Sequence, residues 1–105
     1  MSGMAQIGGE LYADTATAER SFASAEACGS HVTATLERLG STAELDWRRP
    51  RDRVFYVSGP ERSIFVIRCF EIGAASFIPF ISGAGESQDR ISRTTALLYR
   101  GLSGA

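Results

Sequence analysis

Three short apolar runs in the middle of the chain constrain the fold most strongly, because none of them alternates between apolar and polar residues. The runs are VFYV at 54–57, IFVI at 64–67 and FIPFI at 77–81. Successive side chains of a strand point to opposite faces of the sheet, so alternation is typical of a strand with one exposed face. The three runs therefore predict strands that are apolar on both faces.

Turn residues between the runs predict how the strands connect. Ser58-Gly59-Pro60-Glu61 separates the first two runs, and glycine and proline are typical of turns, so 54–72 is expected to form a hairpin. Residues 43–48 alternate as a half-buried strand does, and the polar turn 48–53 follows them. Pro79 has no backbone N–H to donate, which predicts an edge strand or a bulge.

Apolar residues at spacings of three and four predict two helices. The first is expected over 24–39, with Ser24 as its N-cap and Gly40 as a left-handed C-cap. The second is expected over 87–102. Gly29 lies in the middle of the first helix, where it costs about 1 kcal/mol relative to alanine, so we expect it to allow close packing on the sheet.

Together these elements predict the fold class. Strands joined by short turns form an antiparallel sheet, and two helices can cover only one face of it. We expect an α+β two-layer sandwich with three to four strands and two helices on one face, in the order (β)αβββα. Residues 1–15 are small and rich in glycine, so they are expected to be a flexible N-terminal segment before a single domain over 16–105.

Composition bears on the source and the location. The formal net charge is -1, and all 11 basic residues are arginine, which indicates a GC-rich bacterial genome. No run approaches the roughly 20 apolar residues that span a bilayer, and the first residues lack the pattern of a secretory signal. We therefore expect a cytoplasmic protein that does not bind membranes, in which Cys28 and Cys69 are buried, reduced thiols.

The sequence carries no recognisable catalytic motif. His31 is the only histidine, and it has too few partners at ligand spacing for a zinc site. Cys28 lies one turn before it, but a Cys–His catalytic pair also needs a third group that orients the histidine. The segment 82–87 lacks the lysine of a phosphate loop and is expected to be a flexible connection. We expect no catalytic residue, no metal and no cofactor.

One local cluster of basic residues is a candidate partner-binding site. Arginine beside an aromatic residue can bind phosphates and stack on bases. Asp46 and Asp52 are interleaved with the cluster and reduce its field, so a solvated turn is the favoured interpretation. An acidic partner or a nucleic acid remains an alternative, although the net charge disfavours a nucleic acid. The candidate residues are Trp47, Arg48, Arg49, Arg51 and Arg53.

The leading functional hypothesis follows from the strands with two apolar faces. The helices can bury one face, and the other needs a second cover. The cover could be residues 1–15, a second copy of the chain or a partner protein. We expect a small non-enzymatic binding or regulatory protein that forms a homodimer or holds a protein partner through its sheet. The expected interface residues are Phe55, Val57, Phe65, Ile67, Phe77 and Phe80.

A second hypothesis assigns the aromatic residues to a pocket. In this alternative, the protein is a small-molecule-binding domain or a cofactor-free enzyme with a pocket between the sheet and the helices. A deep cavity with convergent polar groups would favour it. The lining residues would be Phe55, Tyr56, Phe65, Phe70 and Phe77.

Overall fold

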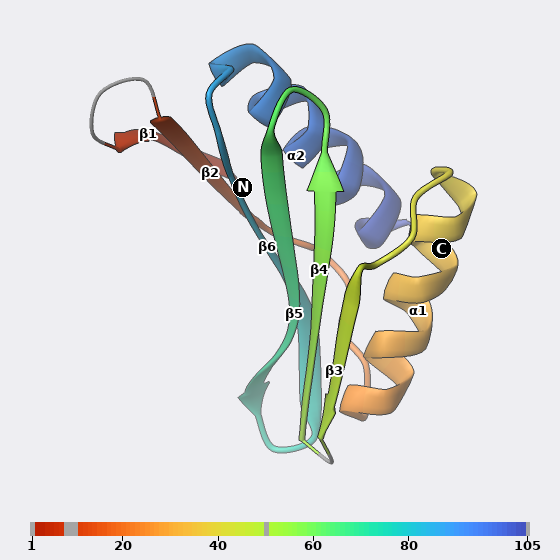
Figure 1. The fold of residues 1–105 in the computed structure, drawn as a ribbon. Coiled ribbons are helices and arrows are strands. Elements are labelled where there is room, and N and C mark those ends of the chain that lie inside the picture. Colours follow the sequence, from red (N-terminus) through yellow and green to blue (C-terminus); the bar gives the residue numbers. More distant parts are fainter. Residues whose placement is uncertain (1, 8–10, 50, 105) are drawn as a thin grey trace.

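The computed structural model describes residues 2–7, 11–49 and 51–104. Figure 1 shows an antiparallel sheet with two helices beside it. The elements in chain order are β1 (Ser2–Ile7), β2 (Leu11–Thr17), α1 (Ala25–Arg38), β3 (Leu45–Arg49), β4 (Asp52–Gly59), β5 (Ser63–Gly73), β6 (Ser76–Gly85) and α2 (Gln88–Ser103).

The strands of the described residues form one six-stranded sheet in the order β1-β2-β6-β5-β4-β3. Every neighbouring pair is antiparallel. Helix α1 packs against β4, β5 and β6, and α2 packs against β2 and β6, so both helices lie on the same face (Figure 1). The α+β class and the hairpin of β4 and β5 are confirmed, but the expected count of three to four strands is too low.

The additional strands come from the N-terminal part of the chain. Strand β2 pairs with β6, and β1 pairs with β2 at the edge of the sheet. Residues 2–7 and 11–17 therefore form strands where a flexible segment was expected. These strands widen the sheet and do not fold back over its free face. Residues 1 and 8–10 of the expected segment lie outside the described residues.

The helix boundaries agree with the capping signals in the sequence. The hydroxyl of Ser24 accepts a hydrogen bond from the backbone N–H of Ala27 at 3.0 Å, and Ser87 caps α2 in the same way. Gly40 follows α1 with φ +74°. A Cβ atom at Gly29 would overlap the guanidinium of Arg53, so this glycine lets α1 approach β4 closely, as expected.

The core lies between the helices and one face of the sheet. A row of paired residues crosses four strands on this face, and each member is at most 2% exposed: Phe55, Ile67, Ile81 and Ala16. Val32 and Leu36 of α1 and the stripe of α2 complete the core. Burial of one such large side chain contributes about 1.5–3 kcal/mol to the free energy of folding. Because several of them are buried here, these contacts hold the helices on this face of the sheet.

Pro79 lies inside the sheet and not on an edge strand. Its carbonyl oxygen accepts a hydrogen bond from the backbone N–H of Ala18 at 3.0 Å. In an antiparallel strand, the N and the C=O of one residue point to the same side. The proline nitrogen therefore faces Ala18, just after the end of β2 at Thr17. The missing N–H leaves this last pair with one hydrogen bond instead of two, at the point where the pairing of β2 with β6 ends.

A disulfide joins Cys28 of α1 to Cys69 of β5. Both residues are buried, and their Cα atoms are 6.0 Å apart, within the range that a disulfide requires. The prediction of two reduced thiols was wrong, because the helical stripe and the inner face of β5 place the two side chains opposite each other. The disulfide ties the first helix to the centre of the sheet.

Candidate interaction surface

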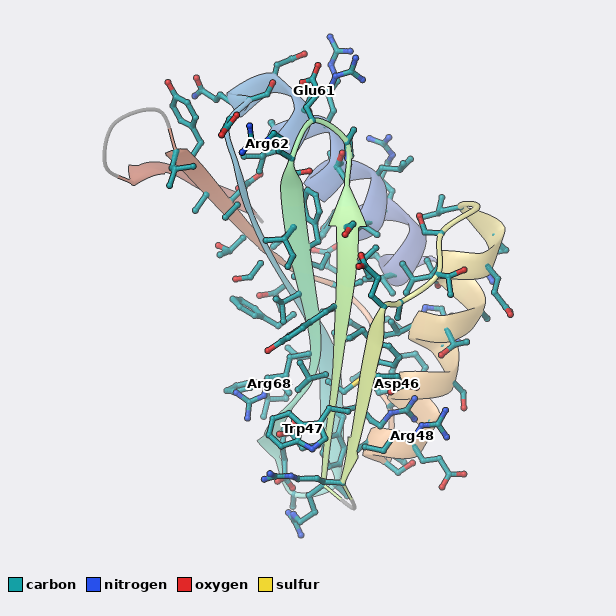
Figure 2. All side chains as sticks on the ribbon, in the orientation of Figure 1. Asp46, Trp47, Arg48, Glu61, Arg62 and Arg68 are labelled. Atoms are coloured by element: carbon teal, nitrogen blue, oxygen red, sulfur yellow. A yellow bond between two sulfur atoms is a disulfide. The ribbon has the colours of Figure 1, made fainter. Side chains whose placement is uncertain are left out.

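The face of the sheet opposite the helices carries a second set of apolar side chains, which we call the open face. Because Phe55, Phe65 and Ile81 point toward the helices, the residues between them in each strand point away. On β3 to β6, the members of the open face are Trp47, Val54, Tyr56, Ile64, Val66, Arg68, Phe70, Ile78, Phe80 and Ser82. Figure 2 shows Trp47 and Arg68 on the side of the sheet away from α1.

The open face exposes several large apolar side chains to solvent. Trp47 is 47% exposed, Tyr56 37%, Ile64 50% and Phe70 45%. Val54, Val66, Ile78 and Phe80 are half-buried between them. Since one large side chain has a surface of about 200 Å², these residues together present roughly 400–500 Å² of apolar surface. A patch of this size matches the largest apolar patch of a typical monomer, and such patches often belong to binding sites.

A shallow depression of about 380 Å³ lies near the middle of the open face. Its lining consists of the Phe70 and Phe80 rings, Val66, Arg68 and Ser82. The guanidinium of Arg68 lies 5.5 Å from the centre of the Phe70 ring and donates to a carboxylate oxygen of Asp52 at 3.2 Å. The depression is therefore mostly apolar, with one cation and one hydroxyl at its wall.

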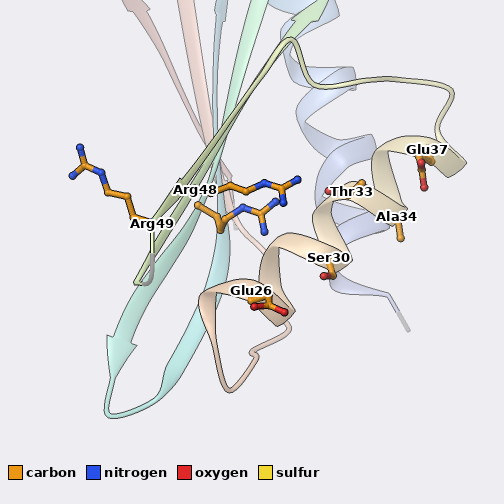
Figure 3. A pocket seen from close by; sticks show the side chains of 8 residues that line it. Glu26, Ser30, Thr33, Ala34, Glu37, Arg48 and Arg49 are labelled. Carbon is orange, nitrogen blue, oxygen red and sulfur yellow. The ribbon is translucent and has the colours of Figure 1, made fainter.

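The basic cluster predicted from the sequence does not form one site. Arg48 points toward α1 and Arg49 points away from it (Figure 3), and the Arg49 guanidinium stacks 4.1 Å from the Trp47 ring. Three of the arginines pair with carboxylates: Arg48 and Arg53 with Asp46, and Arg51 with Glu71. Pairing with Arg51 lowers the pKa of the Glu71 carboxyl, mainly through their hydrogen bond.

Arg53 has a structural position. Its side chain is only 8% exposed, and two of its nitrogens donate to the two carboxylate oxygens of Asp46 at 3.1 and 2.9 Å. A buried guanidinium needs such a bidentate partner because it cannot give up its charge. The pair therefore joins β3 to β4, beside Gly29 of α1, and Arg53 is not available to an acidic partner.

A hollow of about 470 Å³ lies between α1 and β3. Figure 3 shows Glu26 and Glu37 of α1 on one wall and Arg48 facing the helix from the other. Most of its lining side chains are exposed, and charges of both signs border it. It has the character of a solvated groove between oppositely charged walls.

The residues predicted to form the interface divide between the two faces. Five of them lie in the core under the helices: Phe55, Val57, Phe65, Ile67 and Phe77. Only Phe80 lies on the open face. The five residues of the predicted pocket divide in the same way, because Tyr56 and Phe70 are on the open face, so they do not line one cavity. The six residues predicted as an interface therefore do not share one exposed face of the sheet.

His31 and Cys28, which the sequence spacing could have paired, each have a partner elsewhere in the fold. Nε2 of His31 lies 2.9 Å from the carbonyl oxygen of Leu102 at the end of α2, and Cys28 is bonded to Cys69. Among the described residues, no group of three histidine, cysteine or acidic side chains could hold a metal ion. In the same part of the chain, no helix is both long and apolar enough to cross a membrane.

The open face is therefore the strongest candidate site in the described structure. Comparison of the chain with protein-family models, with curated proteins and with solved structures finds no match.

Proposed function

We propose that the protein is a non-enzymatic association module whose open face binds the open face of a second copy. The observation that supports this most strongly is the apolar patch on β3 to β6, which the N-terminal strands leave uncovered. A stable dimer buries about 800 Å² per chain. The exposed apolar side chains supply roughly half of that area, and the half-buried and polar residues around them can supply the rest.

The charges on the open face favour a second copy over an acidic or basic partner. Arg68 and Asp52 lie side by side and neutralise each other, and Arg49 at the border of the face is held on Trp47. The face is therefore mostly apolar, and the charges on it are of both signs. A two-fold interface brings a surface against an identical surface. A face with a large net charge of one sign would repel its copy, and the described residues of the open face have no such net charge.

Two alternatives have less support in the arrangement. A small-molecule site or an enzyme pocket between sheet and helices would need space that the core side chains Phe55 and Phe65 occupy. An acidic or nucleic-acid partner at residues 48–53 would meet three arginines that are already paired with carboxylates.

The test compares the mass of the wild-type chain with that of face variants by size exclusion coupled to light scattering. Tyr56→Glu and Val66→Glu place charges in the centre of the open face. Both variants should be monomers whose far-UV circular dichroism spectrum is that of the folded wild-type protein. Leu97→Glu is the matched control, because Leu97 is an exposed apolar residue of α2, 44% exposed. A dimer that survives both face substitutions would refute the proposal, and a dimer lost only in the Leu97 variant would place the interface on the helices.

The compartment is a separate proposal. The cytoplasm expected from the sequence remains a prediction, and the Cys28–Cys69 disulfide argues for an oxidising compartment, where such bonds persist. Alkylation of free thiols in freshly lysed cells, followed by mass spectrometry, tests this. Protected cysteines would support the oxidising compartment, and two alkylated cysteines would support the cytoplasm.

A further inference from the structure

We infer that, in the dimer, Trp47 of each copy inserts into the depression on the open face of the other copy. This inference rests on the proposed homodimer and adds the residues that hold it together. It is based on two features of the open face that do not touch each other within one chain. One is the half-exposed indole of Trp47 on the edge strand β3, and the other is the depression over β5 and β6.

The register of the sheet places both features on one line. Trp47 pairs with Val54, Val54 pairs with Arg68, and Arg68 pairs with Phe80. This row runs across the strands from the edge to the middle of the depression. Neighbouring strands are about 4.8 Å apart, so the centre of the depression lies roughly 12 Å from Trp47 along the row.

A two-fold axis parallel to the strands joins the two features. Such an axis lies between the two facing sheets. In the second copy it reverses the order of the strands across the sheet, and each residue keeps its height along the strand direction. If the axis runs near the boundary of β4 and β5, it carries Trp47 of one copy onto the depression of the other. Both contacts then form at once, as a two-fold interface requires. The strands of the two sheets would run nearly along each other, as in aligned sheet packing.

The lining of the depression suits an indole. The Phe70 and Phe80 rings and Val66 supply an apolar wall, and the Arg68 guanidinium can lie against the face of the indole. The hydroxyl of Ser82 can accept the indole N–H, which otherwise loses its hydrogen bond to water when it is buried. Tryptophan in a well-packed pocket is the residue that most often dominates the energy of an interface.

The experiment uses Trp47 as its own probe, because it is the only tryptophan of the chain. On dilution of the wild-type protein from dimer to monomer, the emission of Trp47 should shift to longer wavelength as the indole enters water. Trp47→Ala and Phe80→Ala should each raise the dissociation constant of the dimer by about 30-fold or more. The double variant should be little worse than either single variant, because both changes remove the same contact. Leu97→Ala on α2 is the control and should leave the constant unchanged.

The outcomes separate the inference from the proposed function. A wild-type dimer with unchanged Trp47 emission on dilution, or with effects of Trp47→Ala and Phe80→Ala that simply add, would overturn the insertion and leave the homodimer intact. A wild-type chain that is monomeric at every concentration would overturn the homodimer and the inference with it.

Discussion

Reduction of the Cys28–Cys69 disulfide should destabilise the fold by about 4 kcal/mol. The bond joins the middle of α1 to β5 across a sequence separation of 41 residues. A cross-link stabilises a protein mainly because it limits the conformations of the unfolded chain, and the effect grows with the logarithm of the loop length. For a loop of this size, the chain-entropy relation gives roughly 13 cal/mol/K, or about 4 kcal/mol at 25 °C.

Urea denaturation of the oxidised and reduced protein, at one fixed protein concentration, measures this difference. With a slope of about 1–2 kcal/mol per M for a chain of this length, the midpoint should fall by roughly 2–4 M on reduction. The double variant Cys28→Ala/Cys69→Ala is the control, since its midpoint should not respond to reductant. Equal midpoints for the oxidised and reduced wild-type protein would refute the reasoning.

Three further predictions test the core, the contact of α1 with the sheet and the role of His31. Leu36→Ala and Leu98→Ala should each lower the free energy of unfolding by about 2–5 kcal/mol, and unchanged denaturation midpoints would contradict the described core. Gly29→Ala should lower the melting temperature despite the better helix propensity of alanine, because the new methyl group would displace the Arg53 guanidinium; a more stable variant would argue against that contact. Burial lowers the pKa of His31, helped by the charges of Arg20 and Arg38, while the Leu102 carbonyl opposes the shift. The unfolded chain therefore binds a proton more readily than the folded one, so stability should be full above about pH 6.5 and decline as the pH falls through the lowered pKa. His31→Gln should flatten that decline in melting temperature, and an unchanged pH profile would exclude His31 as its source.

The elements with strong local signals could be predicted from the sequence. Ser24 and Gly40 bound the first helix as expected, and the turn predicted at 58–61 lies at 60–62, between β4 and β5. Strand β2 was missed because its inward residues include Asp14 and Ala16, which give no apolar alternation. The signal for β2 lies in its pairing with β6, which is not local.

The face of the sheet that the helices cover and the disulfide could not be predicted, for a related reason. The runs at 54–57 and 64–67 are apolar on both faces, so their sequences do not say which set meets the helices. Which set packs against the helices depends on where Cys28, Val32 and Leu36 of α1 meet the sheet. The same packing of α1 on the sheet brings Cys28 to Cys69.

The measurement that tests the central proposal most directly is a nuclear Overhauser experiment on a mixed dimer. One copy carries ¹³C-labelled methyl groups and the other is unlabelled, so only contacts between copies are detected. The proposed dimer predicts intermolecular signals from the methyl groups of Ile64, Val66 and Ile78 on the open face, and none from Leu97 on α2. Intermolecular signals confined to the helices, or no intermolecular signals at concentrations where a dimer would form, would contradict it.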